Sequence, residues 1–168
     1  MKLIVSPLAG VPSAIETHRP SHVITLISPD APGVVYDGIE KDRHLTLRFN
    51  DITASQEGLV APSAGLIQGL LDFAGRWDRR APMLLHCFAG ISRSTAAAYI
   101  LACHAAGPGT ETEIATRLRR ASGSATPNAL MIALADEILR REGRMAAAIA
   151  AIGRGEEAAQ GSCFQMRL

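Results

Sequence analysis

The feature that most constrains the fold of this chain is a series of short apolar runs that alternate with helical patterns. The run Met83-Leu84-Leu85-His86 is too apolar for a half-exposed strand and is typical of a strand covered on both faces. Four runs have the length and the β-rich composition of strands: 3–5, 22–27, 44–49 and 83–86.

Helical periodicity fills the gaps between these runs. Strands and helices alternate over the first two-thirds of the chain, and helices dominate the last third. We therefore predict an α/β fold with a central, mostly parallel sheet of four to five strands, flanked by helices and followed by a helical C-terminal part. The patterns predict a short helix at 13–18 and longer ones at 59–77, 95–106, 110–118 and 130–139. Within 59–77 we expect the helix to start near Pro62-Ser63.

The chain length of 168 residues predicts one domain, because no linker or change of composition divides 1–168. We expect the core of this domain to cover about 1–142. Residues 143–168 form an Ala- and Gly-rich extension, for which we predict a surface helix at 145–152 and a loose end from 153 onward.

Charge and hydropathy exclude two classes of partner. Seventeen basic and sixteen acidic side chains give a formal net charge of +1, so no electrostatic argument favours nucleic acid. The longest apolar stretches fall short of the ~20 residues that a membrane-spanning helix needs. We predict neither a nucleic-acid nor a membrane partner, and a monomer is the default oligomeric state. An odd number of cysteines, three, favours a cytoplasmic location.

One segment, His86 to Ser94 (HCFAGISRS), has the composition of a binding loop between a buried strand and a helix. Such a loop aims backbone N–H groups and the positive end of the helix at its centre, which makes an anion site. The guanidinium of Arg93 can hold two oxygens of a phosphoryl group. The residues whose backbone would surround the anion are Phe88, Ala89, Gly90, Ile91 and Ser92.

Cys87 opens this loop and is the candidate nucleophile. The same amides and helix end favour its thiolate form, which is the reactive one. Ser94 can donate its hydroxyl to the sulfur and so improve the thiolate as a leaving group. We expect His86 to orient the loop as a structural hydrogen-bonding residue rather than to act as a base.

The segment resembles the signature loop of the cysteine-dependent protein tyrosine phosphatases, His-Cys-x5-Arg-Ser/Thr, and its AGISRS portion is most similar to the dual-specificity branch. The resemblance implies a protein tyrosine phosphatase-like fold, a cysteinyl-phosphate intermediate and no cofactor or metal. It also implies an aspartic acid on a separate loop as general acid and then base. Asp51 fits because it directly follows a predicted strand, whereas Asp42 precedes that strand and Asp72 lies in a helical pattern.

A second resemblance lies downstream of the loop. Arg119-Arg120, Thr126-Pro127-Asn128 and the helical pattern after them are similar to the arginine pair and Pro-Asn helix start of dual-specificity phosphatases. In that family the asparagine braces the signature loop. Asn128 is therefore expected to brace it here, with an ordinary helix N-terminal role as the alternative.

The other cysteines have simpler interpretations. We expect Cys103 to be a buried small residue on the helix after the loop, and Cys163 to be a terminal thiol without a role, with a redox partnership to Cys87 as the alternative. The pairs His86-Cys87 and Cys103-His104 do not have the ligand spacing of a zinc site.

These residues predict a phosphomonoester hydrolase that acts on phosphotyrosine in proteins, with phosphoserine or phosphothreonine as further substrates. The loop has no lysine, which favours a singly phosphorylated substrate. The expected ligands are a phosphorylated protein or a small phosphomonoester, and a phosphate or sulfate ion in the loop. Three alternatives stay open: a phosphate-binding pseudophosphatase, a phosphatase for a non-protein phosphomonoester, and an enzyme of sulfur transfer or oxyanion reduction.

Overall fold

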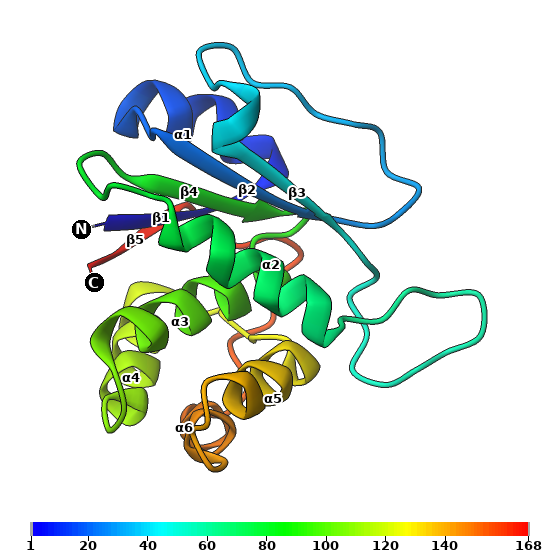
Figure 1. Ribbon diagram of the computed structural model, residues 1–168, viewed down its shortest axis with the longest axis vertical. Coiled ribbons are helices and arrows are strands. Elements are labelled where there is room, and N and C mark those ends of the chain that lie inside the picture. Colours follow the sequence, from blue (N-terminus) through cyan, green and yellow to red (C-terminus); the bar gives the residue numbers. More distant parts are fainter. Residues whose placement is uncertain (1, 168) are drawn as a thin grey trace.

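The computed structural model describes residues 2–167 as one five-stranded sheet with helices on both faces (Figure 1). The strand order is β3-β2-β4-β1-β5, in which the first four strands are parallel and β5 is antiparallel to β1. The predicted α/β class and the mostly parallel sheet are confirmed. The strands are β1 (Lys2–Pro7), β2 (His22–Ile27), β3 (His44–Arg48), β4 (Met83–Cys87) and β5 (Phe164–Arg167).

Strand β4 lies in the middle of the sheet, as its apolar sequence predicts. It pairs with β1 on one side and with β2 on the other, and all five of its residues are buried. A strand in this position needs no polar face, because both of its faces are covered by helices. Its carboxyl end, Cys87, therefore has a firmly held position.

The two faces of the sheet are covered unequally (Figure 1). One face carries α1 (Val11–His18), whose Val11 and Ala14 pack in a small apolar cluster with Ile4 and Leu84. The opposite face carries the larger core, at the centre of which lies α3 (Arg93–Ala106), buried from Arg93 to Cys103. The other helices on this side are α2 (Ala64–Gly75), α4 (Glu111–Ala121), α5 (Ala129–Ile138) and α6 (Arg144–Ile152). Two short 3-10 turns occur elsewhere in the chain, at Leu8–Gly10 and Lys41–Arg43.

Local sequence signals set the helix starts that matter for the site. The Ser63 hydroxyl accepts the Leu66 N–H at 3.4 Å and caps α2, so this helix begins where Pro62-Ser63 predicts. Asn128 caps α5 through the Met131 N–H at 3.0 Å. α3 starts at Arg93, directly after the predicted binding loop.

The C-terminal extension differs from the prediction. Helix α6 is present, but the expected loose end contains β5, which pairs antiparallel with β1 from Val5–Phe164 to Lys2–Arg167. Met166 is buried against the main core, while its neighbours Gln165 and Arg167 are exposed. The extension therefore closes an edge of the sheet instead of fraying from it, and it is not purely helical.

None of the helices within residues 2–167 has both the length and the apolar character required to cross a membrane.

Candidate active site

The signature loop, residues 88–92, connects the end of β4 to the start of α3. It lies at the carboxyl ends of the three adjacent parallel strands β2, β4 and β1. Ligands of open α/β sheets bind at this edge, because the strand-to-helix turns and the helix N-termini face it.

Backbone hydrogen bonds from other segments hold the loop carbonyls outward. Because the peptide unit is planar and trans, an outward carbonyl turns the N–H of the next residue toward the opposite side. Successive inward N–H groups form an anion-binding concavity. The bonds are Leu8 N–H to Phe88 O (3.1 Å), Gly161 N–H to Ala89 O (2.8 Å), Thr126 N–H to Ile91 O (3.0 Å) and Asn128 N–H to Ser92 O (3.4 Å).

The sulfur of Cys87 lies buried at the start of this loop, with the residue only 2% exposed. Its Sγ accepts the Gly90 N–H at 3.2 Å and lies 3.1 Å from the Ser94 hydroxyl. Both groups can donate to a thiolate, so the predicted partner Ser94 is in place. Gly90 has φ +70°, and a Cβ there would lie 2.6 Å from Pro7 N, so only glycine fits.

Arg93 is buried and only partly satisfied. Its Nη1 donates to the Phe49 carbonyl at 2.9 Å, and the guanidinium lies 5.9 Å from the Phe49 ring centroid. Its Nε, by contrast, is buried and finds no hydrogen-bond partner among residues 2–167. The Asp51 carboxylate is 3.9 Å from that Nε, which is too long for a hydrogen bond. A buried cationic donor without a hydrogen-bonded acceptor is costly, so an anion bound in the loop would stabilise Arg93.

Asp51 is brought to the signature loop from the segment after β3. Its Oδ1 accepts the Ser92 hydroxyl at 2.7 Å and the Asn128 Nδ2 at 2.8 Å. Its side chain is 35% exposed, so it can also face a ligand above the loop. The alternatives lie elsewhere. Asp42 lines a cavity with His22 at the amino end of β2, and Asp72 is on α2, where it accepts the Gln68 amide at 2.8 Å.

Asn128 contacts both the segment that carries Asp51 and the signature loop. Its backbone N–H donates to Ser92 O at 3.4 Å, and its side chain makes contacts that the sequence does not indicate. Nδ2 donates to Asp51 and, at 3.2 Å, to the Ile52 carbonyl, while Oδ1 caps α5. Asn128 therefore links three parts of the fold: the segment that carries Asp51 through Nδ2, the signature loop through its backbone N–H, and α5 through Oδ1.

His86 lies in a buried network beneath the loop. Its Nε2 is 2.7 Å from the Thr25 hydroxyl and 2.7 Å from the Tyr36 hydroxyl, and Thr25 is also 2.8 Å from His44 Nε2. Burial and, to a smaller extent, the nearby His44 lower the pKa of His86 to about 4. This network therefore holds a neutral imidazole directly beneath the loop.

The other two cysteines, Cys103 and Cys163, are not part of the site formed by Cys87, Arg93 and Asp51. Cys103 is fully buried on α3, and burial raises its pKa to about 12, so it is an unreactive thiol. Cys163 is exposed on the C-terminal extension, and all three cysteines are free. Within residues 2–167 no group of three His, Cys, Asp or Glu side chains is arranged to hold a metal ion.

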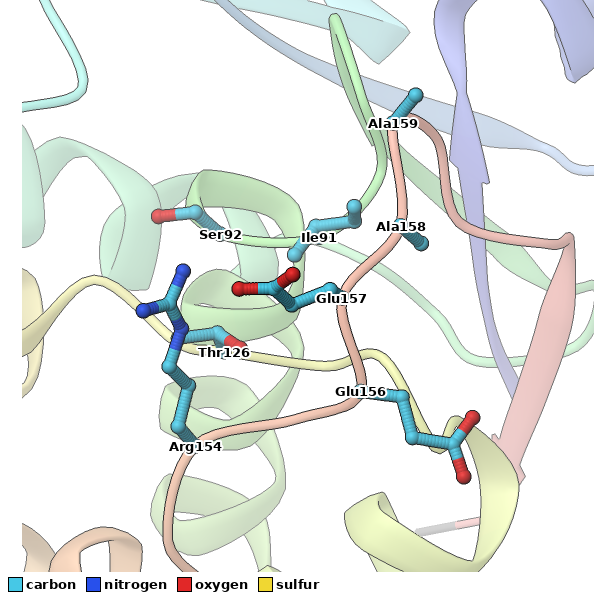
Figure 2. A pocket seen from close by; sticks show the side chains of 8 residues that line it. All are labelled: Ile91, Ser92, Thr126, Arg154, Glu156, Glu157, Ala158 and Ala159. Carbon is cyan, nitrogen blue, oxygen red and sulfur yellow. The ribbon is translucent and has the colours of Figure 1, made fainter.

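A cavity of about 590 Å³ adjoins the loop, and sequence reasoning missed it. Figure 2 shows Ile91 and Ser92 on the loop side and the C-terminal extension opposite them. Arg154 and Glu157 reach from the extension toward the loop, whereas Glu156 points away. The extension thus forms one wall beside the signature loop.

Comparison with known proteins identifies the fold. No family model and no curated protein matches this sequence. Among solved structures, DUSP15 matches with a TM-score of 0.58 and 16% identity over 92% of this chain and 94% of that chain. The human tyrosine phosphatase-like serine/threonine/tyrosine-interacting protein matches with a TM-score of 0.63 and 18% identity over 81% of this chain and 89% of that chain. Human DUSP28 matches with a TM-score of 0.57 and 15% identity over 90% and 95%, respectively. The chain therefore has the protein tyrosine phosphatase-like fold, as predicted.

Proposed function

We propose that this chain is a cysteine-dependent phosphomonoester hydrolase of the tyrosine and dual-specificity phosphatase type. The observation that carries this proposal is the buried Nε of Arg93, which lacks a partner in the described chain beside a loop whose sulfur already accepts an N–H. A phosphoryl group seated among the loop amides would supply that partner. The Nε atoms of Arg117, Arg141 and Arg144 also lack a hydrogen-bond partner between residues 2 and 167, but only that of Arg93 belongs to the residue that directly follows the signature loop.

The first step transfers the phosphoryl group from oxygen to sulfur. The phosphoryl oxygens bind the inward N–H groups and the Arg93 guanidinium, and the Cys87 thiolate attacks phosphorus. The bond from phosphorus to the ester oxygen breaks. Asp51, in its acid form, protonates that oxygen, because an alkoxide or aryloxide leaves poorly without a proton. The products are the free alcohol and cysteinyl phosphate.

The second step returns the enzyme to its starting state. A water molecule attacks phosphorus while the Asp51 carboxylate accepts its proton, and the bond from sulfur to phosphorus breaks. Ser94, 3.1 Å from the sulfur, donates to the departing thiolate and stabilises it. Inorganic phosphate leaves, and Asp51 holds the proton needed for the next cycle.

The loop surroundings favour a singly phosphorylated substrate with an apolar leaving group. The side chains between Cys87 and Arg93 are uncharged, so nothing in the loop meets a second phosphate. Phe88 is 73% exposed and offers an apolar surface at the rim. Phosphotyrosine in a protein fits both features, and a small aryl phosphate is the non-protein alternative.

The competing function is a phosphate-binding protein without turnover. One structural neighbour is named a phosphatase-like interacting protein, so the fold also occurs in proteins that are not named as phosphatases. The hydroxyl beside the sulfur and the carboxylate at the loop favour catalysis, because simple binding requires neither. A cytoplasmic location remains a prediction, supported by three free cysteines.

Cys87→Ser tests the proposal. We expect the purified chain to hydrolyse an aryl phosphate and a phosphotyrosyl peptide, and an acid quench during turnover to trap phosphate on the Cys87 peptide, detected by mass spectrometry. Cys87→Ser should lose hydrolysis and retain binding of inorganic phosphate. Cys163→Ser is the matched control and should keep full activity. Phosphate binding without any hydrolysis by the wild-type chain would establish the pseudophosphatase instead.

A further inference from the structure

The C-terminal extension contacts the peptide unit that faces the nucleophile. The Gly161 N–H donates to the Ala89 carbonyl at 2.8 Å, and the N–H of the same peptide unit, that of Gly90, donates to Cys87 Sγ at 3.2 Å. We propose that Gly161 is a positioning residue of the active site, which orients the Ala89–Gly90 peptide toward the sulfur and the phosphoryl group. This inference rests on the proposed function.

The geometry of a peptide unit makes this coupling direct. Its C=O and N–H point in opposite directions, so a donor that holds the carbonyl outward also holds the N–H inward. If the peptide flipped, the Ala89 carbonyl would face the thiolate and the bound anion, both of which it would repel. The Gly161 bond therefore favours the orientation that binds an anion.

The contact is close enough to transmit a displacement. Gly161 is buried, and a Cβ at this position would lie 3.0 Å from the Gly90 carbonyl oxygen and 3.4 Å from Ile91 Cγ1. On its other side the loop meets Pro7, because a Cβ on Gly90 would lie 2.6 Å from Pro7 N. The loop is thus clamped between the end of β1 and the extension, and a side chain at residue 161 must push on the loop.

The extension is itself anchored on both sides of Gly161. Downstream, β5 pairs with β1 along its whole length. Upstream, the Gly155 N–H donates to the Thr126 hydroxyl at 3.1 Å, and the Glu156 N–H donates to the Gly123 carbonyl at 2.9 Å. Figure 2 shows the segment between these anchors passing beside Ile91. Gly161 therefore has a defined place from which to hold the loop.

A graded pair of substitutions in the full chain, Gly161→Ala and Gly161→Val, tests the inference. We expect kcat on an aryl phosphate to fall about tenfold for the alanine variant and about a hundredfold for the valine variant, since small misplacements of reacting groups have effects of this size. Inhibition by inorganic phosphate should weaken in the same order. Alkylation of Cys87 by iodoacetamide, followed on its own peptide, should require a higher pH, because the thiolate loses an N–H donor.

Two control variants separate this effect from packing. Ser162→Val adds a branched side chain at the next, exposed residue, and Gly69→Ala adds a Cβ on α2 with nothing within 4 Å. Both should keep the wild-type kcat, phosphate inhibition and alkylation profile. The melting temperature of each variant shows whether the substitution destabilises the fold. If Gly161→Val does not fold, the result for Gly161→Ala alone decides whether Gly161 positions the loop.

The outcomes also separate this inference from the proposed function. Unchanged kcat, phosphate inhibition and alkylation profile in a folded Gly161 variant would overturn the positioning role, even with an active wild-type enzyme. If the wild-type chain hydrolyses no phosphomonoester, the proposed function fails. Phosphate binding and Cys87 alkylation then still decide whether Gly161 orients the loop.

Discussion

Asn128→Ser separates the two roles of the residue that links Asp51 to helix α5. A serine caps a helix as well as an asparagine does, so α5 keeps its N-terminal acceptor for the Met131 N–H. The variant loses both Nδ2 bonds, to Asp51 Oδ1 at 2.8 Å and to the Ile52 carbonyl at 3.2 Å. We expect little loss of stability and a measurable loss of acid catalysis.

The size of the loss follows from the remaining contacts. A hydrogen bond to a charged group contributes about 1.5–3 kcal/mol. Because the Ser92 hydroxyl still holds Asp51 at 2.7 Å, the effect should lie at the low end of that range, near the ~1.4 kcal/mol that corresponds to a tenfold loss in kcat. Asn128→Ala should lose a further ~1 kcal/mol of stability through the cap, without a larger effect on catalysis.

The assay is kcat on a series of phosphomonoesters whose leaving alcohols differ in acidity. A positioned acid matters for a weakly acidic alcohol and hardly at all for an activated nitrophenol. We expect a tenfold loss on phenyl and alkyl phosphates and none on the nitrophenyl ester. Asp51→Asn should lose about 10²–10⁴-fold on the poor leaving groups, and adding Asn128→Ser should lower the rate no further. An equal loss on every ester, or additive losses in the double variant, would refute the argument.

Three further substitutions test the rest of the site. Arg93→Lys should lower kcat by about 10²–10³-fold in steady-state kinetics, because an ammonium cannot replace the planar fork; a wild-type rate would count against the phosphate clamp. Asp42→Asn should keep the wild-type kcat on phenyl phosphate, because Asp42 lines a cavity with His22 away from the loop; if it lowers kcat as Asp51→Asn does, the acid is misassigned. The pKa of His86 is lowered to about 4 in the folded chain, so its imidazole stays neutral there, whereas the unfolded chain gains a proton below about pH 6.5. The free energy of unfolding should therefore fall by up to about 3 kcal/mol between pH 6.5 and 4. Urea melts at several pH values should show a shallower fall in His86→Gln, and identical slopes would contradict this.

The sequence alone determined the parts of this protein that are encoded by neighbouring residues. Cys87, Arg93 and Ser94 lie within one strand-loop-helix segment, so their spacing predicts a common anion site before any tertiary contact is known. The apolar run of β4 predicts the buried central strand, and Ser63 predicts the start of α2. These signals can be read from the sequence because side chains that share a face of a helix or strand recur every few residues.

The tertiary structure decided which distant groups meet at the loop. Ser92 and Asn128 lie 41 and 77 residues from Asp51, and the helix-start signal of Asn128 carries no information about the partner of its Nδ2. The four residues of β5 are too few to show a reliable alternation, so the sequence predicts no strand from 153 onward. The bond from Gly161 to Ala89 depends on that strand, because pairing with β1 places the chain beside the loop. Such contacts arise from how the whole domain packs, and a local pattern of residue types does not record them.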